Sequence, residues 1–270
     1  MNLSVIIVSY NTKELLVNCL ESLKEEKRKT KFEVIVIDNA STDGSATVVK
    51  EKFPWVKLII NEKNLGFATA VNQGIRLSDR RDIFLLNSDA RFEKGTLEKL
   101  GDFEEKVRPA IIGARLINPD GTVQPSVFRL PNIKRAILEY WLGKKGYFSK
   151  YTPSGSGPQE VESVSGGAML ISREVIEKIG FLDGRYFMYF EDLDYCRRAR
   201  KAGFKVYYLP TARIVHEHGA SGRDLAVAED QWRRLIPSSK IYYGLLIHYL
   251  ITGIIWSGEK LRRLFFKAGT

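Results

Sequence analysis

The sequence has 270 residues, 44% of them apolar and 27% charged, and it shows no internal repeat, so it has the composition of a globular protein with a substantial core and excludes a solenoid. Its two cysteines, Cys19 and Cys196, lie far apart and outside any paired pattern, which argues against a disulfide framework or a zinc site and for a reducing compartment. The net charge of +10 suits a polyanion, an anionic membrane surface or a phosphorylated substrate.

The N-terminal third alternates short β-branched runs with helical patterns. Strands are expected at 3–9, 32–38, 56–61 and 83–87, and helices at 13–24 and 68–77. This alternation predicts an α/β fold with a mostly parallel sheet covered by helices. Because no basic segment precedes the first apolar run, we expect no signal peptide.

Polar side chains follow three of these strands, at the carboxyl ends where α/β sheets bind ligands, and should converge on one edge of the sheet. Asn87 and Asp89 share a face of an extended segment, so both can reach one divalent cation that keeps positions open for diphosphate oxygens. A solvated turn is the alternative. In chain order, the clusters are Ser9-Tyr10-Asn11, Asp38-Asn39 and Asn87-Ser88-Asp89.

Two further features of this half suit a nucleotide. Asp38 precedes a turn into a helix, where a carboxylate either binds a base or ribose edge or only caps the turn. Segment 61–74 places a glycine and two amides around a helix start, and a nucleotide can lie against that backbone. The candidates there are Asn64, Gly66, Phe67 and Asn72, with core packing as the alternative for Phe67.

Beyond Asp89 the alternation loosens. We expect a helix at 94–106, a strand at 111–116 and a mobile loop at 151–158, which is rich in Ser, Gly and Pro. Gly166 and Gly167 precede an apolar strand, where they either let a ligand approach the backbone or form only a turn. A helix at 191–202 starts with several carboxylates, which the helix dipole stabilises.

The C-terminal part contains a strand at 205–209, closed by Pro210, and then His216 and His218, which are either structural or metal ligands. The rest reads as one long helical region. Its uncharged stretch 241–256 is too short to span a bilayer, and basic residues flank it. We expect a helix in the interface of a membrane, with a core helix or dimer contact as alternatives, and no nucleic-acid partner. The basic residues of this part are Arg233, Arg234, Lys240, Lys260, Arg262, Arg263 and Lys267.

Six motifs occur in the order seen in family 2 glycosyltransferases of the GT-A fold. They are V-S-Y-N, I-D-N-A-S-T-D-G, N-x-G-F-A-x-A-x-N-x-G, L-L-N-S-D, S-G-G-A-M-L and F-E-D-L-D-Y-C-R-R, and they extend from Val8 to about His218. With N-S-D in place of D-x-D, the chain most resembles bacterial rhamnosyltransferases. The resemblance implies a GT-A (Rossmann-like) sheet flanked by helices, here with a C-terminal helical extension, and an inverting, metal-dependent hexosyltransferase that uses Mg²⁺ or Mn²⁺.

The resemblance also implies roles for residues of the donor site. Tyr10, Asp38 and Asn64 would hold the nucleotide, and Asp89 would be the metal-binding carboxylate of the D-x-D position. His216 corresponds to a position near the diphosphate. Asn87 departs from the pattern, because it replaces a charged metal ligand with a neutral one and so weakens the expected metal affinity.

On the acceptor side, the resemblance makes Asp192 the general base, with Glu191 as the second choice. Gly166 and Gly167 would border the donor sugar and the acceptor. We expect Asp194 to pair with Arg197 or Arg198, and Arg197 is also a candidate for contact with the sugar or acceptor.

We therefore expect a glycosyltransferase domain at 1–235, with a nucleotide-binding half at 1–90 and an acceptor-binding half at 91–235, and an amphipathic helical segment at 236–270. The expected reaction moves L-rhamnose from dTDP-L-rhamnose to a saccharide or lipid-linked acceptor in cell-surface polysaccharide synthesis, in the cytoplasm at the inner face of the cell membrane. The alternatives are a UDP-hexose donor, a nucleotide-sugar-binding protein without catalysis, and a nucleotidyltransferase. The missing N-terminal Gly-rich loop with a following lysine counts against the last.

Overall fold

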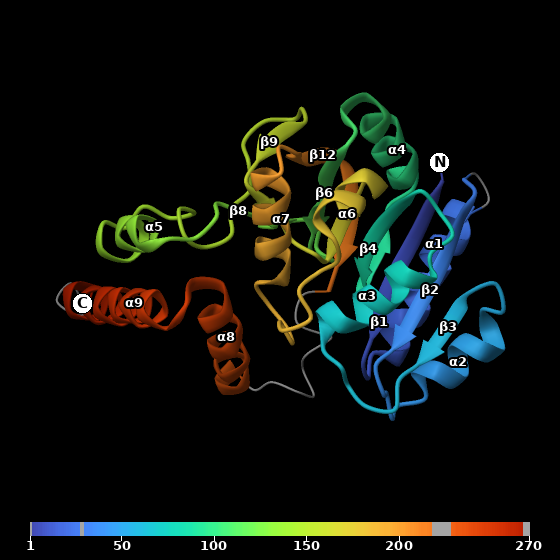
Figure 1. Ribbon diagram of the computed structural model, residues 1–270, viewed down its shortest axis with the longest axis horizontal. Helices are drawn as coiled ribbons and strands as arrows, with labels where there is room; N and C mark the ends of the chain where they lie inside the picture. Colours follow the sequence, from blue (N-terminus) through green and yellow to red (C-terminus); the bar gives the residue numbers. More distant parts are fainter. Residues whose placement is uncertain (1, 28–29, 218–227, 267–270) are drawn as a thin grey trace.

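The computed structural model describes residues 2–27, 30–217 and 228–266. Its N-terminal half is a parallel sheet whose strands lie in the order β3-β2-β1-β4 (Figure 1). Helices connect these strands, as the alternating sequence pattern predicts, and burial on both faces explains the continuous apolar runs. The elements are β1 (Leu3–Ser9), α1 (Lys13–Lys27), β2 (Phe32–Asp38), α2 (Ser45–Lys52), β3 (Lys57–Ile60), α3 (Phe67–Leu77) and β4 (Asp82–Asn87).

The second half continues the same sheet in the order β11-β6-β12-β5, with β7 beside β6 and β9 beside β12. Strand β11 runs antiparallel to both β4 and β6 and joins the two halves. The sheet is thus mixed beyond β4. Its elements are β5 (Ala90–Phe92), α4 (Thr96–Val107), β6 (Ala110–Ile117), β7 (Val123–Gln124), β8 (Val127–Phe128), α5 (Ile133–Ala136), η1 (Ile137–Trp141), β9 (Gln159–Val161), β10 (Ser163–Val164), β11 (Ala168–Ile171), α6 (Arg173–Ile179), α7 (Glu191–Lys201) and β12 (Lys205–His216).

Strand β12 is longer than the expected strand at 205–209. It passes through Pro210 and ends at His216, so the prediction that Pro210 closes the strand is wrong. The register against β6 shifts between Leu209 and Arg213, and a proline is tolerated at such an irregularity because no regular ladder bond is required of it there. The extra length pairs His216 with Ala90 of β5 and so carries the imidazole to the end of β4.

Two hydrophobic cores cover the two faces of the sheet. Alternate residues of β1 point into different cores, with Val5 and Ile7 facing α1, α2 and α4 while Ile6 faces α3, α6 and α7. Cys19 and Cys196 are free and buried, one in each core. Burial raises the pKa of both thiols, that of Cys196 to about 12, so neither is a reactive thiolate at neutral pH.

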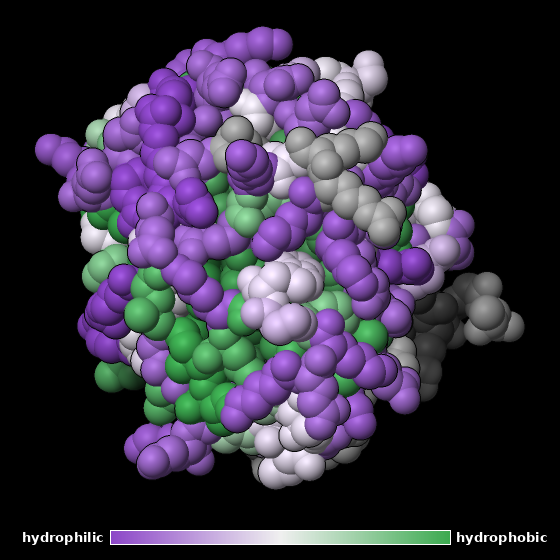
Figure 2. All heavy atoms as spheres, turned by 90° about the vertical axis from the view of Figure 1, so that its right-hand side faces the viewer, coloured by the Kyte–Doolittle hydropathy of each residue, from purple (hydrophilic) through white to green (hydrophobic). Residues whose placement is uncertain are grey.

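The C-terminal part consists of two helices, α8 (Ala228–Tyr243) and α9 (Leu245–Phe266), in place of the expected single helical region. Gly244 separates them with a φ of 77°, a left-handed conformation that ends a helix. Helix α9 lies beside α5 and η1, away from the sheet (Figure 1). No helix in the described ranges is long and apolar enough to cross a membrane. The side of the molecule turned away from α9 is covered mainly by hydrophilic side chains around an apolar area (Figure 2).

Candidate functional site

Strained backbone marks the carboxyl edge of the sheet. The non-glycine residues with positive φ in the described ranges are Asn11, Ala40, Tyr189 and Phe190, with φ between 51° and 71°. Such conformations cost about 1–3 kcal/mol each and cluster at functional sites. Each of the four is itself a predicted site residue or lies within a few residues of one, in the turns after β1 and β2 and before α7.

A buried chain of hydroxyls ties the end of β1 to the end of β4. Ser9 Oγ lies 3.0 Å from Thr12 Oγ1, and the Thr12 hydroxyl donates to Ser88 Oγ at 2.9 Å. Asn11 links the next turn, because its Oδ1 accepts from the Thr42 amide at 2.8 Å. Ser9 and Ser88 are therefore brought together as expected. Both side chains are buried, so they hold the ends of β1 and β4 together from the interior of the protein.

Asp38 caps the turn as one of its two expected roles, and a contact of its other oxygen with a nucleotide stays a prediction. Its Oδ1 caps the turn by accepting from the Ser41 amide at 2.9 Å. Its Oδ2 is buried with no hydrogen-bond partner in the described part of the chain, and such an orphan acceptor suits a ribose hydroxyl or a base N–H. Tyr10 lies half-buried at the end of β1, the strand that pairs with the one carrying Asp38.

Asn39, which the sequence placed beside Asp38 without a role, organises the next wall. Its Nδ2 donates to Asn64 Oδ1 at 2.8 Å, and its Oδ1 accepts from the Leu65 amide at 3.0 Å. Asn64 Oδ1 also accepts from the Gly66 amide at 2.9 Å. Asn64 is thus held next to Asp38 as expected, although the link through Asn39 required a contact between distant segments that no local pattern reveals.

Gly66 and Asn72 hold the segment that leads to α7. A Cβ on Gly66 would lie 2.6 Å from the Phe187 carbonyl oxygen, which accepts from the Phe67 amide at 2.7 Å. The side chain of Asn72 donates through Nδ2 to the Leu182 carbonyl at 2.8 Å and accepts through Oδ1 from the Leu182 N–H at 3.0 Å. Their observed role is to position this segment, and a nucleotide contact of either residue stays a prediction.

His216 stands between the end of β4 and a short strand after β6. Its Nδ1 lies 2.7 Å from Gln124 Oε1, while its Nε2 lies 3.2 Å from Asp89 Oδ1 and 3.1 Å from Asn87 Nδ2. His216, Asp89 and Gln124 are all buried. The sequence missed Gln124 because a two-residue strand gives no periodic signal. His218, the other histidine of the motif, lies outside the described residues.

The corner of Asp89 and His216 fits a divalent cation. An Nδ1–H that donates to Gln124 makes Nε2 an acceptor, which faces both the Asp89 carboxylate and Asn87 Nδ2. A carboxylate oxygen and an imidazole nitrogen this close together are a donor set that a divalent cation can share. Within the described ranges no group of three His, Cys, Asp or Glu side chains is placed to hold a metal ion. With Asp89 and His216 as protein ligands, a diphosphate would supply others. Asn87 turns its Nδ2 toward His216, and its role as a metal ligand stays a prediction.

Asp192 lies against this corner across a turn of two glycines. Its Oδ2 accepts from the Gly166 amide at 3.1 Å, and the Asn87 amide donates to the Gly167 carbonyl at 3.0 Å. A Cβ on Gly167 would lie 3.1 Å from Asn87 Nδ2, so the missing side chain permits this close approach. Residues more than 100 positions apart thus meet at one edge of the sheet, as the sequence predicts.

The carboxylates of Glu191 and Asp192 differ in their environments. Burial and the neighbouring Asp192 raise the pKa of Glu191 to about 8, and its Oε2 has no hydrogen-bond partner among the residues described. Burial raises the pKa of Asp192 too, while the Gly166 amide and the Lys150 ammonium lower it. The hydrogen bond from the Gly166 amide favours the ionised form of Asp192, whereas Glu191 Oε2 has no such partner among the described residues, so Asp192 is the more suitable proton acceptor of the two.

The expected ion pair of Asp194 is confirmed with both arginines. Arg197 Nη2 lies 2.7 Å from Asp194 Oδ1, and Arg198 Nε lies 2.8 Å from Asp194 Oδ2. The Arg197 guanidinium also stacks 3.9 Å from the centre of the Tyr242 ring and donates to the Tyr242 carbonyl. These contacts join α7 to α8, and a contact of Arg197 with a sugar or acceptor stays a prediction.

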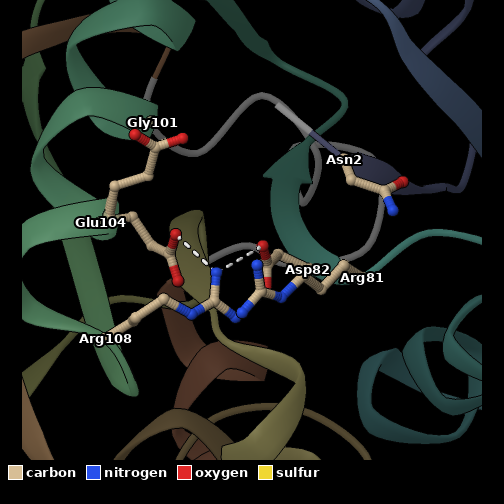
Figure 3. Close-up of a pocket in the computed structure, with 7 residues that line it drawn as sticks. Asn2, Arg81, Asp82, Gly101, Glu104 and Arg108 are labelled. Carbon is tan, nitrogen blue, oxygen red and sulfur yellow. Dashed lines mark hydrogen bonds and ion pairs between the residues drawn. The ribbon is translucent and has the colours of Figure 1, made fainter.

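Two cavities are lined by other residues. One of about 50 Å³ sits at the opposite end of β4, where Arg108 binds Asp82, Glu104 and Glu174 within 3.3 Å, and Figure 3 shows the first two of these carboxylates around it. This charge cluster has a structural explanation, since it ties α4 and α6 to the sheet. The other, of about 500 Å³, lies between α1 and β5. Its lining residues are Asn18, Glu21, Ser22, Glu25, Arg91, Phe92 and Glu217.

Residues 4–180 match the family model described as glycosyl transferase family 2. The N-acetylglucosaminyl-diphospho-decaprenol L-rhamnosyltransferase of Mycobacterium tuberculosis is 31% identical over 243 residues, which cover 83% of this chain and 79% of the relative. The dTDP-rhamnosyl transferase RfbF of Shigella flexneri is 26% identical over 225 residues, covering 81% and 70%.

Two solved structures resemble the fold. S. aureus TarS 1–349 in complex with UDP has a TM-score of 0.60 and 16% identity, covering 94% of this chain and 70% of that one. GalNAc-T7 with UDP, GalNAc and Mn²⁺ has a TM-score of 0.62 and 19% identity, covering 81% of this chain and 44% of that one. Both likenesses confirm the expected GT-A architecture of a central sheet flanked by helices.

Proposed function

The chain belongs to glycosyl transferase family 2, and on that premise we propose that it moves a sugar from a nucleotide-sugar to a hydroxyl group with inversion at the anomeric carbon. One observation carries this proposal. Asp192 lies across the Gly166-Gly167 turn from the corner of Asn87 and Asp89. A base and a diphosphate site therefore flank one space, which is what an in-line displacement requires.

The donor would lie along the ends of β1, β2 and β4. Asp38 Oδ2, which has no hydrogen-bond partner among the described residues, would accept from the nucleoside, with Tyr10 after the neighbouring strand β1 and Asn64 bonded to Asn39. We propose dTDP-L-rhamnose as the donor, which the names of the M. tuberculosis and S. flexneri relatives support. A UDP-hexose is the second candidate, because the resembling TarS structure holds UDP.

In the proposed reaction Asp192 accepts the proton of the acceptor hydroxyl, whose oxygen attacks the anomeric carbon while the diphosphate leaves on the opposite face. Burial raises the pKa of Glu191 to about 8 and so favours its protonated form, which makes Glu191 the second choice for this role. Mg²⁺ or Mn²⁺ held by Asp89 and His216 would supply charge neutralisation for the leaving diphosphate. Gln124 orients the imidazole through Nδ1.

We propose a saccharide or lipid-linked saccharide as the acceptor, in cell-surface polysaccharide synthesis at the inner face of the cell membrane. The M. tuberculosis relative is named for a diphospho-decaprenol acceptor, and the net charge of +10 suits an anionic one. Residues 1–90 would bind the nucleotide and 91–235 the acceptor, while 236–270 would contact the membrane.

A donor panel tests this proposal. The protein is incubated with dTDP-L-rhamnose, UDP-glucose, UDP-galactose or UDP-N-acetylglucosamine, a saccharide-lipid acceptor and Mg²⁺ or Mn²⁺, and the released nucleoside diphosphate is measured. We expect acceptor-dependent release with one donor, most of all dTDP-L-rhamnose, and its loss in EDTA. Donor binding without release under any of these conditions would instead support a nucleotide-sugar-binding protein without catalysis.

A further inference from the structure

Helix α9 and the end of η1 leave a large apolar surface exposed. Leu246 is 75% exposed, Trp256 65% and Leu142 62%. The exposed side chains of α9 form one stripe, opposite the buried His248, Ile251 and Gly258. Contiguous apolar surface of this kind marks an interaction site. We call it the apolar face, formed by Trp141, Leu142, Leu245, Leu246, Ile247, Tyr249, Leu250, Trp256 and Leu261.

The apolar face is held in a defined shape by contacts between its two segments. Trp141 Nε1 donates to the Ile254 carbonyl at 3.1 Å and to Ser257 Oγ at 3.0 Å. Gly258 lets the backbones meet, since a Cβ there would lie 2.6 Å from the Tyr140 carbonyl oxygen. The guanidinium of Arg262 adds a bond to the Glu139 carbonyl. The surface is therefore preorganised for its partner.

Basic side chains surround the apolar face. The Lys240 ammonium lies 5.3 Å from the Tyr249 ring centre, and that of Lys260 lies 5.2 Å from the Trp256 ring centre. Lys144 and Lys145 are exposed directly after Leu142. Glu259 is the one acidic residue between 235 and 262, and it is exposed. Glu139 of η1 is buried and accepts from the Phe148 and Ser149 amides, so it adds no charge to this surface. A cationic rim around aromatic and aliphatic side chains complements an anionic surface.

We propose that the apolar face docks on the surface of an anionic lipid bilayer, with α9 lying in the plane of the interface. Tryptophan and tyrosine favour this depth, where Lys and Arg contribute about 1 kcal/mol each with anionic lipids. A second copy is the less suitable partner, because two surfaces with the same cationic rim repel each other. The inference extends the membrane contact proposed for 236–270 to residues 141–145, and it holds whichever donor is used.

Helix α8, which directly precedes the docked helix α9, contacts the start of the catalytic helix α7. The Ser238 hydroxyl donates to the Met188 carbonyl at 2.7 Å, and the rings of Tyr242 and Tyr243 lie 5.3 Å and 5.7 Å from the Phe190 ring. Phe190 immediately precedes Glu191 and the base of the proposed function, Asp192. Docking would therefore fix the orientation of the site relative to the bilayer, and this last step rests on the proposed function.

Vesicle flotation of the full chain tests the docking. Vesicles of phosphatidylcholine alone are compared with vesicles that also contain phosphatidylglycerol. The test variants are Leu250→Glu and the pair Lys144→Gln with Lys145→Gln. Leu77→Glu is the matched control for the leucine, because Leu77 and Leu250 are both 49% exposed. Lys50→Gln with Lys52→Gln on α2 is the matched control for the lysines, which are exposed in both pairs.

We expect the parent and both controls to float with anionic vesicles and much less with neutral ones. Loss of two lysines should weaken binding about 30-fold, and Leu250→Glu at least about tenfold. The docking inference is wrong if the parent does not bind anionic vesicles, if test and control variants bind alike, or if light scattering shows a dimer that Leu250→Glu dissociates. Vesicle binding with no sugar transfer by the parent would instead count against the proposed function alone.

Discussion

Two neighbouring carboxyls at the start of α7 have different partners. Oε2 of the buried Glu191 has no hydrogen-bond partner among the described residues, whereas Asp192 accepts hydrogen bonds from the Gly166 and Leu193 amides. Burial raises the pKa of both carboxyls, that of Glu191 to about 8, and the two amides favour the ionised form of Asp192. The sequence ranked Asp192 first only by resemblance, and the environments supply the physical reason.

The raised pKa of Glu191 predicts a pH-dependent loss of stability. Folded Glu191 stays protonated while the unfolded chain ionises, so the parent loses stability as the pH rises from about 4.5 to about 8. Glu191→Gln has no carboxyl to ionise and so removes this pH dependence. The free energy of unfolding of the variant, relative to that of the parent, should therefore rise by at least about 1 kcal/mol between pH 5 and pH 8. Urea unfolding at both values measures it. Glu51→Gln, on the exposed surface of α2, is the control, and an equal gain in both variants would contradict the assignment.

Gln124 is expected to matter through His216. Because its Oε1 fixes Nδ1 of the imidazole at 2.7 Å, Gln124→Ala frees the ring to turn away from Asp89. Mn²⁺-dependent binding of nucleoside diphosphate should weaken about 10- to 100-fold, while binding without metal changes little. Calorimetry with and without Mn²⁺ measures this split. Gln159→Ala, on β9, should leave both affinities unchanged, and an unchanged Gln124→Ala would remove His216 from the metal site.

At the scale of elements, the end of α8 packs against the turn before α7 and holds it in place. Tyr242 is buried against Arg197 and Phe190, and the turn it covers includes two residues with positive φ. A strained turn persists only where its surroundings hold it. The corner proposed to bind the donor is formed instead by the ends of β1, β2 and β4.

Tyr242→Ala should therefore lower turnover by about 10- to 100-fold, since a small displacement of the base is costly, and leave donor affinity within about twofold. Steady-state kinetics with a donor-binding titration separates the two quantities. Tyr249→Ala, which removes an exposed tyrosine from α9, should change neither in solution. An equal fall in donor affinity would show that Tyr242 stabilises the whole domain and not only the turn before α7.

The elements that local pattern predicts are those with strong periodicity. β1 and β2 have the expected bounds, and β3, β4, α1 and α3 differ by a few residues. The sequence did not reveal that Ala168–Ile171 enters the sheet antiparallel between β4 and β6, because strand order depends on contacts between distant segments. For the same reason the sequence assigned no role to Asn39 and missed Gln124 and Lys150, although each contacts or influences a residue that the sequence did identify.

At the scale of the whole molecule, the carboxyl ends of β1, β2 and β4, where we propose that the nucleotide binds, lie on one half of the sheet (Figure 1). The apolar face with its lysines lies on the helical extension. The sequence indicated the extension as 236–270. It did not include Trp141 and Leu142, because their proximity to α9 follows from tertiary packing alone. The expected mobility of 151–158 stays a prediction.

This arrangement predicts that the physical state of the acceptor decides how much the apolar face matters. Leu250→Glu should slow transfer to a lipid acceptor embedded in anionic vesicles at least about tenfold, because the enzyme no longer concentrates at the surface. Transfer to a short-chain acceptor dissolved in water should be unchanged. Equal rates of parent and variant on vesicles would show that docking of the apolar face does not contribute to transfer.

The most direct measurement of the central claim compares turnover and donor affinity in Asp192→Asn. The same change at Asp102, exposed on α4, is the control. If Asp192 is the general base, Asp192→Asn should lose about 10²- to 10⁴-fold in the rate of sugar transfer while it binds the nucleotide-sugar as the parent does, and Asp102→Asn should behave like the parent. Transfer by Asp192→Asn at the parental rate would show that Asp192 is not the base.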